Sequence, residues 1–315
     1  MDDGIVLGPR GIPGDGRGTV VTVGTFDGVH RGHWEVLQEI GRRAAQTDRR
    51  AVLVTFHPHP LRIVKPEIAP ALLTTPDEKK EILAESALDY AVFLRFTPAL
   101  SRYSPERFVR EILVGRMEVQ ELVIGYDHGF GRDRSGDAGT LRRLGAELGF
   151  GVDVVDPVPL DGGPVSSTRI REAVAGGRMG EARRGLGRLY SLRGVVVRGD
   201  GRGRGLGFPT ANLQVDSSDK LLPPAGIYAV WGVLRRGTFA GALHLGPRPT
   251  FRGSEPSVEL HLMDFDDEIY GEEVRVDFVE YLRPVEPFDS VEGLVEQMRA
   301  DVARSRSVLS ADVRR

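Results

Sequence analysis

The sequence predicts an α/β domain built on a mostly parallel sheet, followed by a domain of antiparallel β-structure with a terminal helix. Three observations lead to this prediction. The 315 residues favour about two domains, each large enough to bury its own core. Short apolar runs alternate with helical stretches up to about residue 186. Beyond residue 187 such runs follow one another with only turns between them.

The first part contains five short runs rich in β-branched residues, separated by stretches with helical signals. An N-cap residue followed by proline marks two helix starts, at Thr75 with Pro76 and at Ser104 with Pro105. Another short helix follows Ser167 and is closed by glycine. Strands separated by helices imply βαβ units and a parallel sheet. The five expected strands are 19–23, 51–56, 90–96, 121–125 and 152–158.

In the second part, strand-like runs follow one another without helical stretches between them. This pattern predicts an antiparallel sheet or a small barrel. Its last stretch, 290–309, has apolar residues at helical spacing and predicts one terminal helix. The boundary is expected within 177–190, which gives domains 1–186 and 187–315. The expected strands are 192–198, 226–234, 238–246, 257–265 and 272–282.

Composition narrows the class of protein. With 40% hydrophobic and 28% charged residues, the chain has the make-up of an ordinary globular protein. A net charge of −3 gives no global field that would attract nucleic acid or a membrane surface. The chain has no cysteine, which excludes disulfides and agrees with a reducing compartment. The first ten residues do not read as a signal peptide. We therefore expect a cytoplasmic protein with small-molecule partners.

One glycine-rich stretch, GTFDGVHRGH (24–33), lies between the first expected strand and the first helix. Neither a Walker A loop nor a GxGxxG fingerprint is present. The glycines would allow the backbone to approach a phosphate, and a helix N-terminus favours anions. His30 and His33 share one helical face and can donate to a polyphosphate. The alternative is that these histidines only cap and pack the helix.

Two further loops carry histidines at strand ends. TFHPHP (55–60) closes the next strand, and GYDHGFGRDRSGD (125–137) supplies His128, Arg132 and Arg134. Five of the seven histidines thus follow strands whose carboxyl ends meet at one sheet edge, where ligands bind. Zinc is conceivable for such a set, but no metalloprotease-like spacing is present. Polyphosphate binding is the preferred interpretation.

These motifs carry a family resemblance. GTFDGVHRGH resembles the HxGH signature of nucleotidyltransferases that attack the α-phosphate of ATP. Together with TFHPHP, GYDHGFGRDRSG and VSSTRIR (165–171), it is similar to the N-terminal module of bacterial bifunctional riboflavin kinase/FMN adenylyltransferases. The resemblance implies a Rossmann-like nucleotidyltransferase domain over residues 1–186. It also implies that His30, His33 and Arg169 hold the ATP phosphates and stabilise the departing pyrophosphate.

The same resemblance implies two sets of binding residues in this domain. The ATP set is Gly24, Phe26, Asp27, Gly28, His30, His33, Ser167, Thr168 and Arg169. The FMN set is His57, Pro58, His59, Asp127 and Arg132.

Three motifs extend the resemblance to the second half. GRGLGFPTANL (203–213) and VELHLMDF (258–265) resemble the nucleotide motif and the glutamate-bearing strand of riboflavin kinases, and FVEYLRPVEPF (278–288) their later pattern. They imply a six-stranded barrel over 187–315 that phosphorylates riboflavin, so that the chain makes FMN and then FAD. The implied ATP set is Gly205, Gly207, Phe208, Pro209 and Thr210, and the flavin set is Arg283, Glu286 and Phe288.

The residue types suit this chemistry. The Thr210 hydroxyl and the Asn212 amide offer hard oxygen ligands for Mg²⁺. Glu259 alternates with Val258 and Leu260, so its carboxylate should project to one face, where it can accept the proton of an attacking hydroxyl.

One departure and two alternatives remain. HLGPRPTF (244–251) carries His244 where the family usually has asparagine, and His128 stands where phenylalanine is frequent. A nucleotidyltransferase for another phosphate ester, with the barrel as a binding module, would share several of these motifs. The Gly/Arg patch 199–207 could also contact RNA, but it lacks interleaved aromatic residues.

Overall fold

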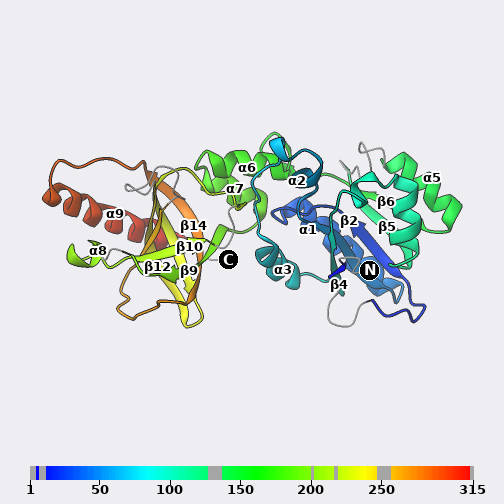
Figure 1. Cartoon of the computed structure of the whole chain (residues 1–315), viewed down its shortest axis with the longest axis horizontal. Coiled ribbons are helices and arrows are strands. Elements are labelled where there is room, and N and C mark those ends of the chain that lie inside the picture. The colour runs from blue at the N-terminus through cyan, green and yellow to red at the C-terminus, as the bar shows by residue number, and fades with distance from the viewer. Residues whose placement is uncertain are drawn as a thin grey trace. The chain divides into compact units, whose positions relative to one another are not determined.

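The computed structural model describes residues 5–6, 12–126, 137–199, 202–215, 219–246 and 257–312. The chain divides into two compact units, Met1–Ser167 and Thr168–Arg315 (Figure 1).

The first unit is built on a six-stranded sheet with the order β1-β4-β3-β2-β5-β6. The strands β2 to β6 are parallel and confirm the five expected runs. β1 is short and runs antiparallel to β4, and the sequence analysis did not predict it. The strands are β1 Ile5–Val6, β2 Thr19–Val23, β3 Arg50–His57, β4 Tyr90–Arg95, β5 Val119–Gly125 and β6 Gly151–Val155.

Helices connect these strands and bury both faces of the sheet. Thr75 and Ser104 cap α3 and α4 as predicted, since each side chain accepts the backbone N–H three residues later. The helices are α1 Arg31–Gln46, α2 Pro60–Val64, α3 Pro76–Ala84, α4 Pro105–Phe108 with a π-helical continuation Val109–Val114, and α5 Ala138–Leu148. Short 3₁₀ turns lie at Pro66–Ile68 and Leu100–Arg102, and a small hairpin pairs β7 Pro159–Leu160 with β8 Gly163–Pro164.

The core has two layers because successive strand residues point to opposite faces. Val21, Val52 and Leu122 pack with α4 and α5 residues on one face. On the other, Val20 and Leu53 pack with α1 and α3 residues. Burial on both faces explains why these strands read as continuous apolar runs.

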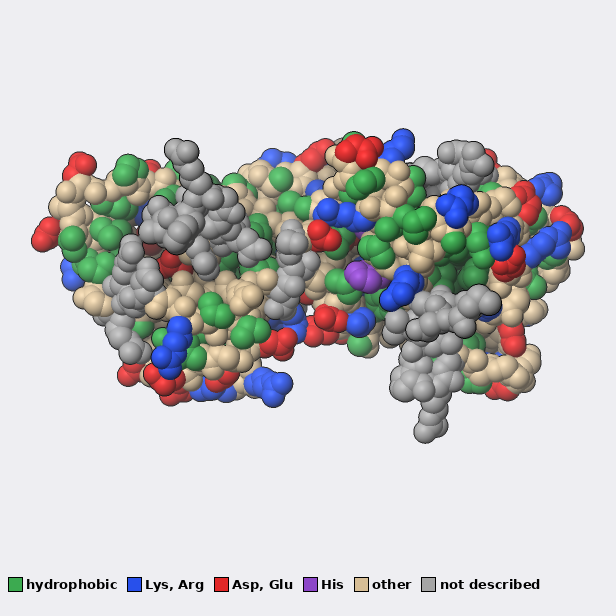
Figure 2. Space-filling view, in the orientation of Figure 1, with side chains coloured by type: hydrophobic (Ala, Val, Ile, Leu, Met, Phe, Trp, Pro, Cys, Tyr) green, Lys and Arg blue, Asp and Glu red, His purple; other side chains and the backbone are tan. Residues whose placement is uncertain are grey.

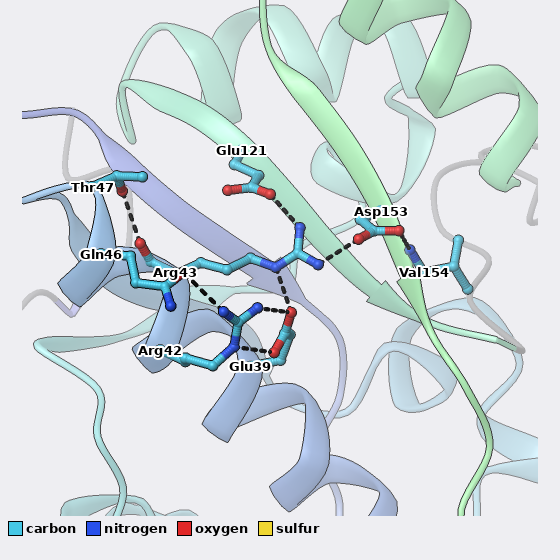
Figure 3. Close-up of polar contacts among 8 residues, drawn as sticks. All are labelled: Glu39, Arg42, Arg43, Gln46, Thr47, Glu121, Asp153 and Val154. Carbon is cyan, nitrogen blue, oxygen red and sulfur yellow. Dashed lines mark hydrogen bonds and ion pairs between the residues drawn. The ribbon is translucent and has the colours of Figure 1, made fainter.

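Arg43 ties α1 to the sheet (Figure 3). Its guanidinium pairs with Glu39 at 2.6 Å and also contacts the carboxylates of Glu121 in β5 and Asp153 in β6. Arg42 binds Glu39 from the other side, and these two arginines lower the pKa of Glu39 to about 2, mainly through the hydrogen bond from Arg42. This network fixes the helix that follows the glycine-rich loop.

The loop after β2 lies at the topological switch point. β2 has β3 on one side and β5 on the other, so the chain turns away in opposite directions from this position. Ligands of open parallel sheets bind at the carboxyl ends of strands at such a point.

The second unit contains a closed antiparallel barrel with the order β10-β13-β12-β11-β14-β9. Five of its strands confirm expected runs. β10 was not predicted as a strand, because its residues were assigned to a binding motif. The strands are β9 Tyr190–Val197, β10 Ala211–Val215, β11 Gly226–Leu234, β12 Gly237–Gly246, β13 Ser257–Leu262 and β14 Glu273–Arg283.

The rings of Tyr190, Tyr228 and Phe278 are buried in the barrel and pack against one another. The expected terminal helix is present as α9, which packs on β11, β12 and β14. The helices are α6 Ser167–Ala175, α7 Met179–Leu186, α8 Arg202–Gly205 and α9 Val291–Ala311.

On the face drawn in Figure 2, acidic and basic side chains are interspersed over the described surface.

Two candidate active sites

The loop 24–30 has an unusual backbone. Phe26 and Val29 have φ values of +46° and +37°, and Gly28 has a φ of +80°. A positive φ is a real outlier for a β-branched residue such as Val29. Such conformations cost about 1–3 kcal/mol each and persist only where the surroundings hold them. Val29 is fully buried and Phe26 nearly so, so packing holds this loop in place.

His30 and His33 form a reciprocal cap at the start of α1. The Nδ1 of His30 accepts the backbone N–H of His33, and the Nδ1 of His33 accepts the backbone N–H of His30, both at 3.3 Å. The two rings stack with centroids 3.6 Å apart, and Phe26 stacks on His33 at 4.3 Å. Because Nδ1 is the acceptor in both rings, a neutral imidazole here carries its hydrogen on Nε2.

This arrangement is compatible with both interpretations of the motif, phosphate binding by the histidines and capping of the helix. The histidines do cap and pack the helix, as the alternative held. The cap also fixes which nitrogen of each ring is the donor, and it places that pair of donors at a helix N-terminus, which favours an anion.

Asp27 faces the protein interior. Its carboxylate accepts the backbone N–H groups of Leu73 and Thr74 at 3.0 and 3.1 Å and the Thr74 hydroxyl at 3.3 Å. It is 1% exposed. Ser167 donates its hydroxyl to the Asp27 carbonyl at 2.8 Å, which brings this predicted ATP residue to the loop. Thr168 and Arg169 follow Ser167 in α6.

The predicted FMN residues lie at the end of β3 and beyond. His57 is the exposed last residue of that strand, and Pro58 separates it from His59. The Nδ1 of His59 accepts the N–H of Leu61 and so caps α2. Asp127 and Arg132, together with His128 and Arg134, lie outside the described residues.

In the barrel, three polar residues form one row across neighbouring strands. Asn212 of β10 lies directly opposite Glu259 of β13, and Glu259 lies opposite His244 of β12. Directly opposed residues project to the same face of a sheet. The flanking Val258 and Leu260 are buried in the barrel interior. The row therefore lies on the outer face of the barrel.

Glu259 is held at this face but remains accessible. The Ser257 hydroxyl donates to its Oε1 at 2.9 Å, and the Nδ1 of His244 lies 4.0 Å from the same oxygen. The side chains of His244 and Glu259 are 34% and 36% exposed. Burial lowers the pKa of His244, and the nearby Glu259 carboxylate opposes this effect. A neutral His244 does not compensate the negative charge of Glu259.

The glycine-rich segment before β10 is tightly folded. A Cβ on Gly203 would lie 2.3 Å from the Phe208 carbonyl oxygen, and Gly207 has a φ of +84°. The Gly203 carbonyl accepts the N–H groups of Leu206 and Phe208. His261 holds the other end, where its Nδ1 lies 2.9 Å from the Pro209 carbonyl oxygen. The turn leads into Thr210 and the row described above.

The donor set fits Mg²⁺. A Cβ on Gly199 would lie only 2.0 Å from the Asn212 Nδ2, so the amide is closely backed by the chain. Among the described residues no group of three His, Cys, Asp or Glu side chains could hold a metal ion. Mg²⁺ commonly uses one or two protein oxygens together with water and substrate phosphates. The Thr210 hydroxyl and the Asn212 amide oxygen suit that pattern.

Arg283 binds the terminal helix. Its Nε and Nη2 donate to the two Asp301 oxygens at 2.9 and 2.7 Å, and its guanidinium lies 5.9 Å from the Phe288 ring centroid. Asp301 is buried in α9 and also accepts from Gln297. Of the predicted flavin set, Glu286 is exposed in the connection to α9. Arg283 thus fixes the position of α9 against β14.

Several residues of these sites were not predicted from the sequence: Thr74, Lys79, Ser257, His261 and Asp301. One of them carried a usable signal, because Lys79 lies four residues before Leu83 and therefore shares the buried face of α3. Ser257 contacts Glu259 two positions away in the same strand, and the remaining residues act through contacts between segments farther apart in the sequence.

Comparison with known proteins identifies the family of each half of the chain. Residues 13–169 match the family model described as FAD synthetase, and residues 186–309 match the model described as riboflavin kinase. Three curated relatives are described as bifunctional riboflavin kinase/FMN adenylyltransferase. The Listeria monocytogenes protein is 36% identical over 292 residues, 91% of each chain. The Pseudomonas fluorescens protein is 36% identical over 312 residues, 99% of each chain. The Escherichia coli K12 protein is 34% identical and covers 92% of each chain.

One solved structure shares the fold across both units. A crystal structure from Streptococcus pneumoniae, described as a macrolide-efflux protein, has a TM-score of 0.83 and 31% identity, and the match covers 92% of this chain and 94% of that one. Within the part of the chain described here, no helix is long and apolar enough to cross a membrane.

Proposed function

The chain belongs to the bifunctional riboflavin kinase/FMN adenylyltransferase family and carries both activities, and we propose that each activity uses one of the two sites above. FMN is adenylylated at the loop 24–33 in the first unit. Riboflavin is phosphorylated on the outer face of the barrel, around Glu259. We assign residues 1–186 to the first activity and 187–315 to the second.

In adenylyl transfer, a phosphate oxygen of FMN forms a bond to the α-phosphorus of ATP. The bond from that phosphorus to the bridging oxygen breaks, and pyrophosphate leaves. The nucleophile is already anionic, so the site needs no base. His30 and His33 donate from Nε2 to the phosphate oxygens on which charge develops, and Ser167, Thr168 and Arg169 add donors there. Such positioned donors are usually the largest contribution to catalysis of this kind.

In the kinase reaction, the riboflavin 5′-hydroxyl attacks the γ-phosphorus of ATP, and ADP leaves. This nucleophile is an alcohol and must lose its proton. Glu259 accepts the proton, and the Ser257 hydroxyl holds the carboxylate in place. Thr210 and Asn212 would hold Mg²⁺, whose charge would offset that of the ATP phosphates. Gly205 and Gly207 give the nucleotide phosphates access to the backbone.

The reciprocal cap of His30 and His33 supports the first assignment most directly, since it fixes two donors at a helix N-terminus. A paired assay tests the proposal: riboflavin with ATP and Mg²⁺ in one arm, and FMN with ATP and Mg²⁺ in the other, with the flavins separated by chromatography. We expect FMN and FAD in the first arm and FAD in the second. FMN without FAD in both arms would identify the first unit as a nucleotidyltransferase for another phosphate ester.

The cellular setting follows from the substrates. We place the protein in the cytoplasm, where ATP is abundant and a chain without cysteine has no need of an oxidising compartment. Its partners are then the small molecules riboflavin, FMN and ATP, and neither nucleic acid nor a membrane is required.

A further inference from the structure

A buried ammonium group lies behind the loop 24–30. Lys79 of α3 is 8% exposed, and its Nζ donates to the Thr25 carbonyl oxygen at 2.7 Å. Lysine is rarely buried unless it has a partner. Its neighbour Lys80, by contrast, is half exposed and pairs with Asp77 at the surface.

The segment 73–79, which contains Lys79, also holds the loop 24–30 at a second point. The backbone of Leu73 and Thr74 binds the Asp27 carboxylate, and the Thr74 hydroxyl accepts the Gly28 N–H at 3.1 Å. Residues 73–79 therefore hold the loop on both sides of Phe26, through Asp27 and through Thr25. We call this set of contacts the rear clamp.

The rear clamp lies where the backbone is least favourable. Phe26, at φ +46°, is bracketed by the two held residues Thr25 and Asp27. Val29, at φ +37°, follows two residues later and precedes the capping His30. A local conformation of this kind persists only if its surroundings over-determine it. The position of the two imidazole donors thus depends on contacts made from behind the loop.

We propose that Lys79 is a positioning residue for adenylyl transfer: its ammonium fixes the Thr25 carbonyl and thereby holds the loop in the conformation that receives the ATP phosphates. This inference rests on the proposed function of the loop 24–33. It assigns to Lys79 no contact with substrate.

The charge of Lys79 is part of this role. Burial lowers the pKa of Lys79 to about 8, while the Asp27 carboxylate of the loop favours the charged form. In α3 itself, the adjacent Glu78 directs Oε2 to the Thr75 N–H. A charged donor makes a stronger hydrogen bond than a neutral one. The hold on Thr25 should therefore weaken as the pH rises through about 8.

The first test is Lys79→Met, which keeps the length of the side chain and removes the donor, with Lys80→Met as the matched control. A hydrogen bond from a charged group contributes about 1.5–3 kcal/mol, so kcat/KM for ATP in FMN adenylylation should fall about 10- to 100-fold. The riboflavin kinase activity of the same preparation should stay within about twofold. Lys80→Met should leave both activities near wild type. Unchanged adenylylation by Lys79→Met would overturn the proposal.

The second test is a pH profile, which remains informative if Lys79→Met folds poorly. The pKa of an unfolded lysine is near 10.5, so between about 8 and 10.5 the unfolded state binds more protons and stability rises with pH from this group. If Lys79 had only a structural role, adenylylation would therefore not fall as the pH rises from about 8 to 10.5. We expect wild-type adenylylation to fall between pH 7.5 and 9.5 relative to kinase activity, and a flat ratio would overturn the proposal.

The two hypotheses fail in different ways. If the loop 24–33 is not the adenylylation site, His33→Ala retains FAD formation. If only the role of Lys79 is wrong, His33→Ala loses FAD formation while Lys79→Met keeps it.

Discussion

Replacing Glu259 with glutamine tests the proposed proton transfer from the riboflavin 5′-hydroxyl to the Glu259 carboxylate. Glutamine keeps the shape of the side chain and one acceptor oxygen, so the hydrogen bond from Ser257 can remain. The substitution removes the negative charge and the basicity. Asn212, on the neighbouring strand, and the Thr210 hydroxyl, which we propose as the Mg²⁺ ligands, stay in place.

The structure sets the expected size of the effect. Glu259 is about one-third exposed, so neutralising it leaves no buried charge unpaired and should change the free energy of unfolding little. Its loss should therefore appear in the rate. General-base catalysis contributes about 10²–10⁴-fold, which corresponds to about 3–5 kcal/mol at 1.36 kcal/mol per tenfold. We expect kcat for riboflavin phosphorylation to fall by this factor while KM for ATP changes little.

The assay uses both activities of one preparation. In the proposed assignment, riboflavin with ATP reports the barrel site, and FMN with ATP reports the loop 24–33, where the nucleophile is already anionic. Glu280→Gln is the matched control, since Glu280 lies in β14, a barrel strand that does not pair with β13, and its carboxylate pairs with Arg304 at the surface. We expect FMN adenylylation to be unchanged in both variants.

Two results would refute this reasoning. If Glu259→Gln retains full kinase activity, the carboxylate is only a polar residue on the outer face of the barrel. If both activities fall together while Glu280→Gln is normal, one shared site explains the data better than two.

Three further predictions concern other parts of the chain. His33→Ala should lower FAD formation from FMN about 10²–10³-fold and leave kinase activity intact; normal FAD formation by the folded variant would remove the histidine from the phosphate site. His244→Asn should preserve or raise kinase kcat/KM in steady-state assays, because it restores the residue usual in the family, and a large loss would show that the site depends on the imidazole. Arg43→Met should lower the free energy of unfolding by about 1–3 kcal/mol at pH 7 in urea titrations, since three carboxylates lose their shared partner. The Glu39 part of that loss should shrink as the pH falls from about 4.5 toward 2, because protonation removes the stabilisation that its lowered pKa represents; a loss that is independent of pH would contradict it.

The alternation of strands and helices was predictable from the sequence because local rules determine it. Fully buried parallel strands read as apolar runs, and Thr75 and Ser104 cap their helices through bonds to residues three positions later. The strand β10 was missed for a physical reason: its five residues follow a proline-containing turn and carry Asn212 on their outward face. A short strand with a polar outer face resembles a loop.

The candidate sites were predictable only as residue types at strand ends. The sequence indicated that His30 and His33 share a face, but not that each caps the other's backbone. Asp27 was predicted to bind ATP, and the structure turns its carboxylate to Leu73 and Thr74, which are 46 and 47 positions away. No periodicity or spacing rule specifies contacts between such distant segments, and the same holds for Lys79 and Thr25.

The placement of carboxylates separates the two chemistries. The loop 24–33 contains one carboxylate, and that group, Asp27, is buried and satisfied by backbone N–H groups. What this loop offers a ligand is therefore a set of donors, which suits a reaction between two phosphates. Glu259 is accessible and lies beside a neutral His244, which suits a reaction whose nucleophile is an alcohol. A base in the first site would repel both anionic substrates, and a site of donors alone would leave the riboflavin hydroxyl protonated. Under the proposed assignment, each site therefore has what its own nucleophile requires, and we expect that exchanging the two sets of residues would disable both reactions.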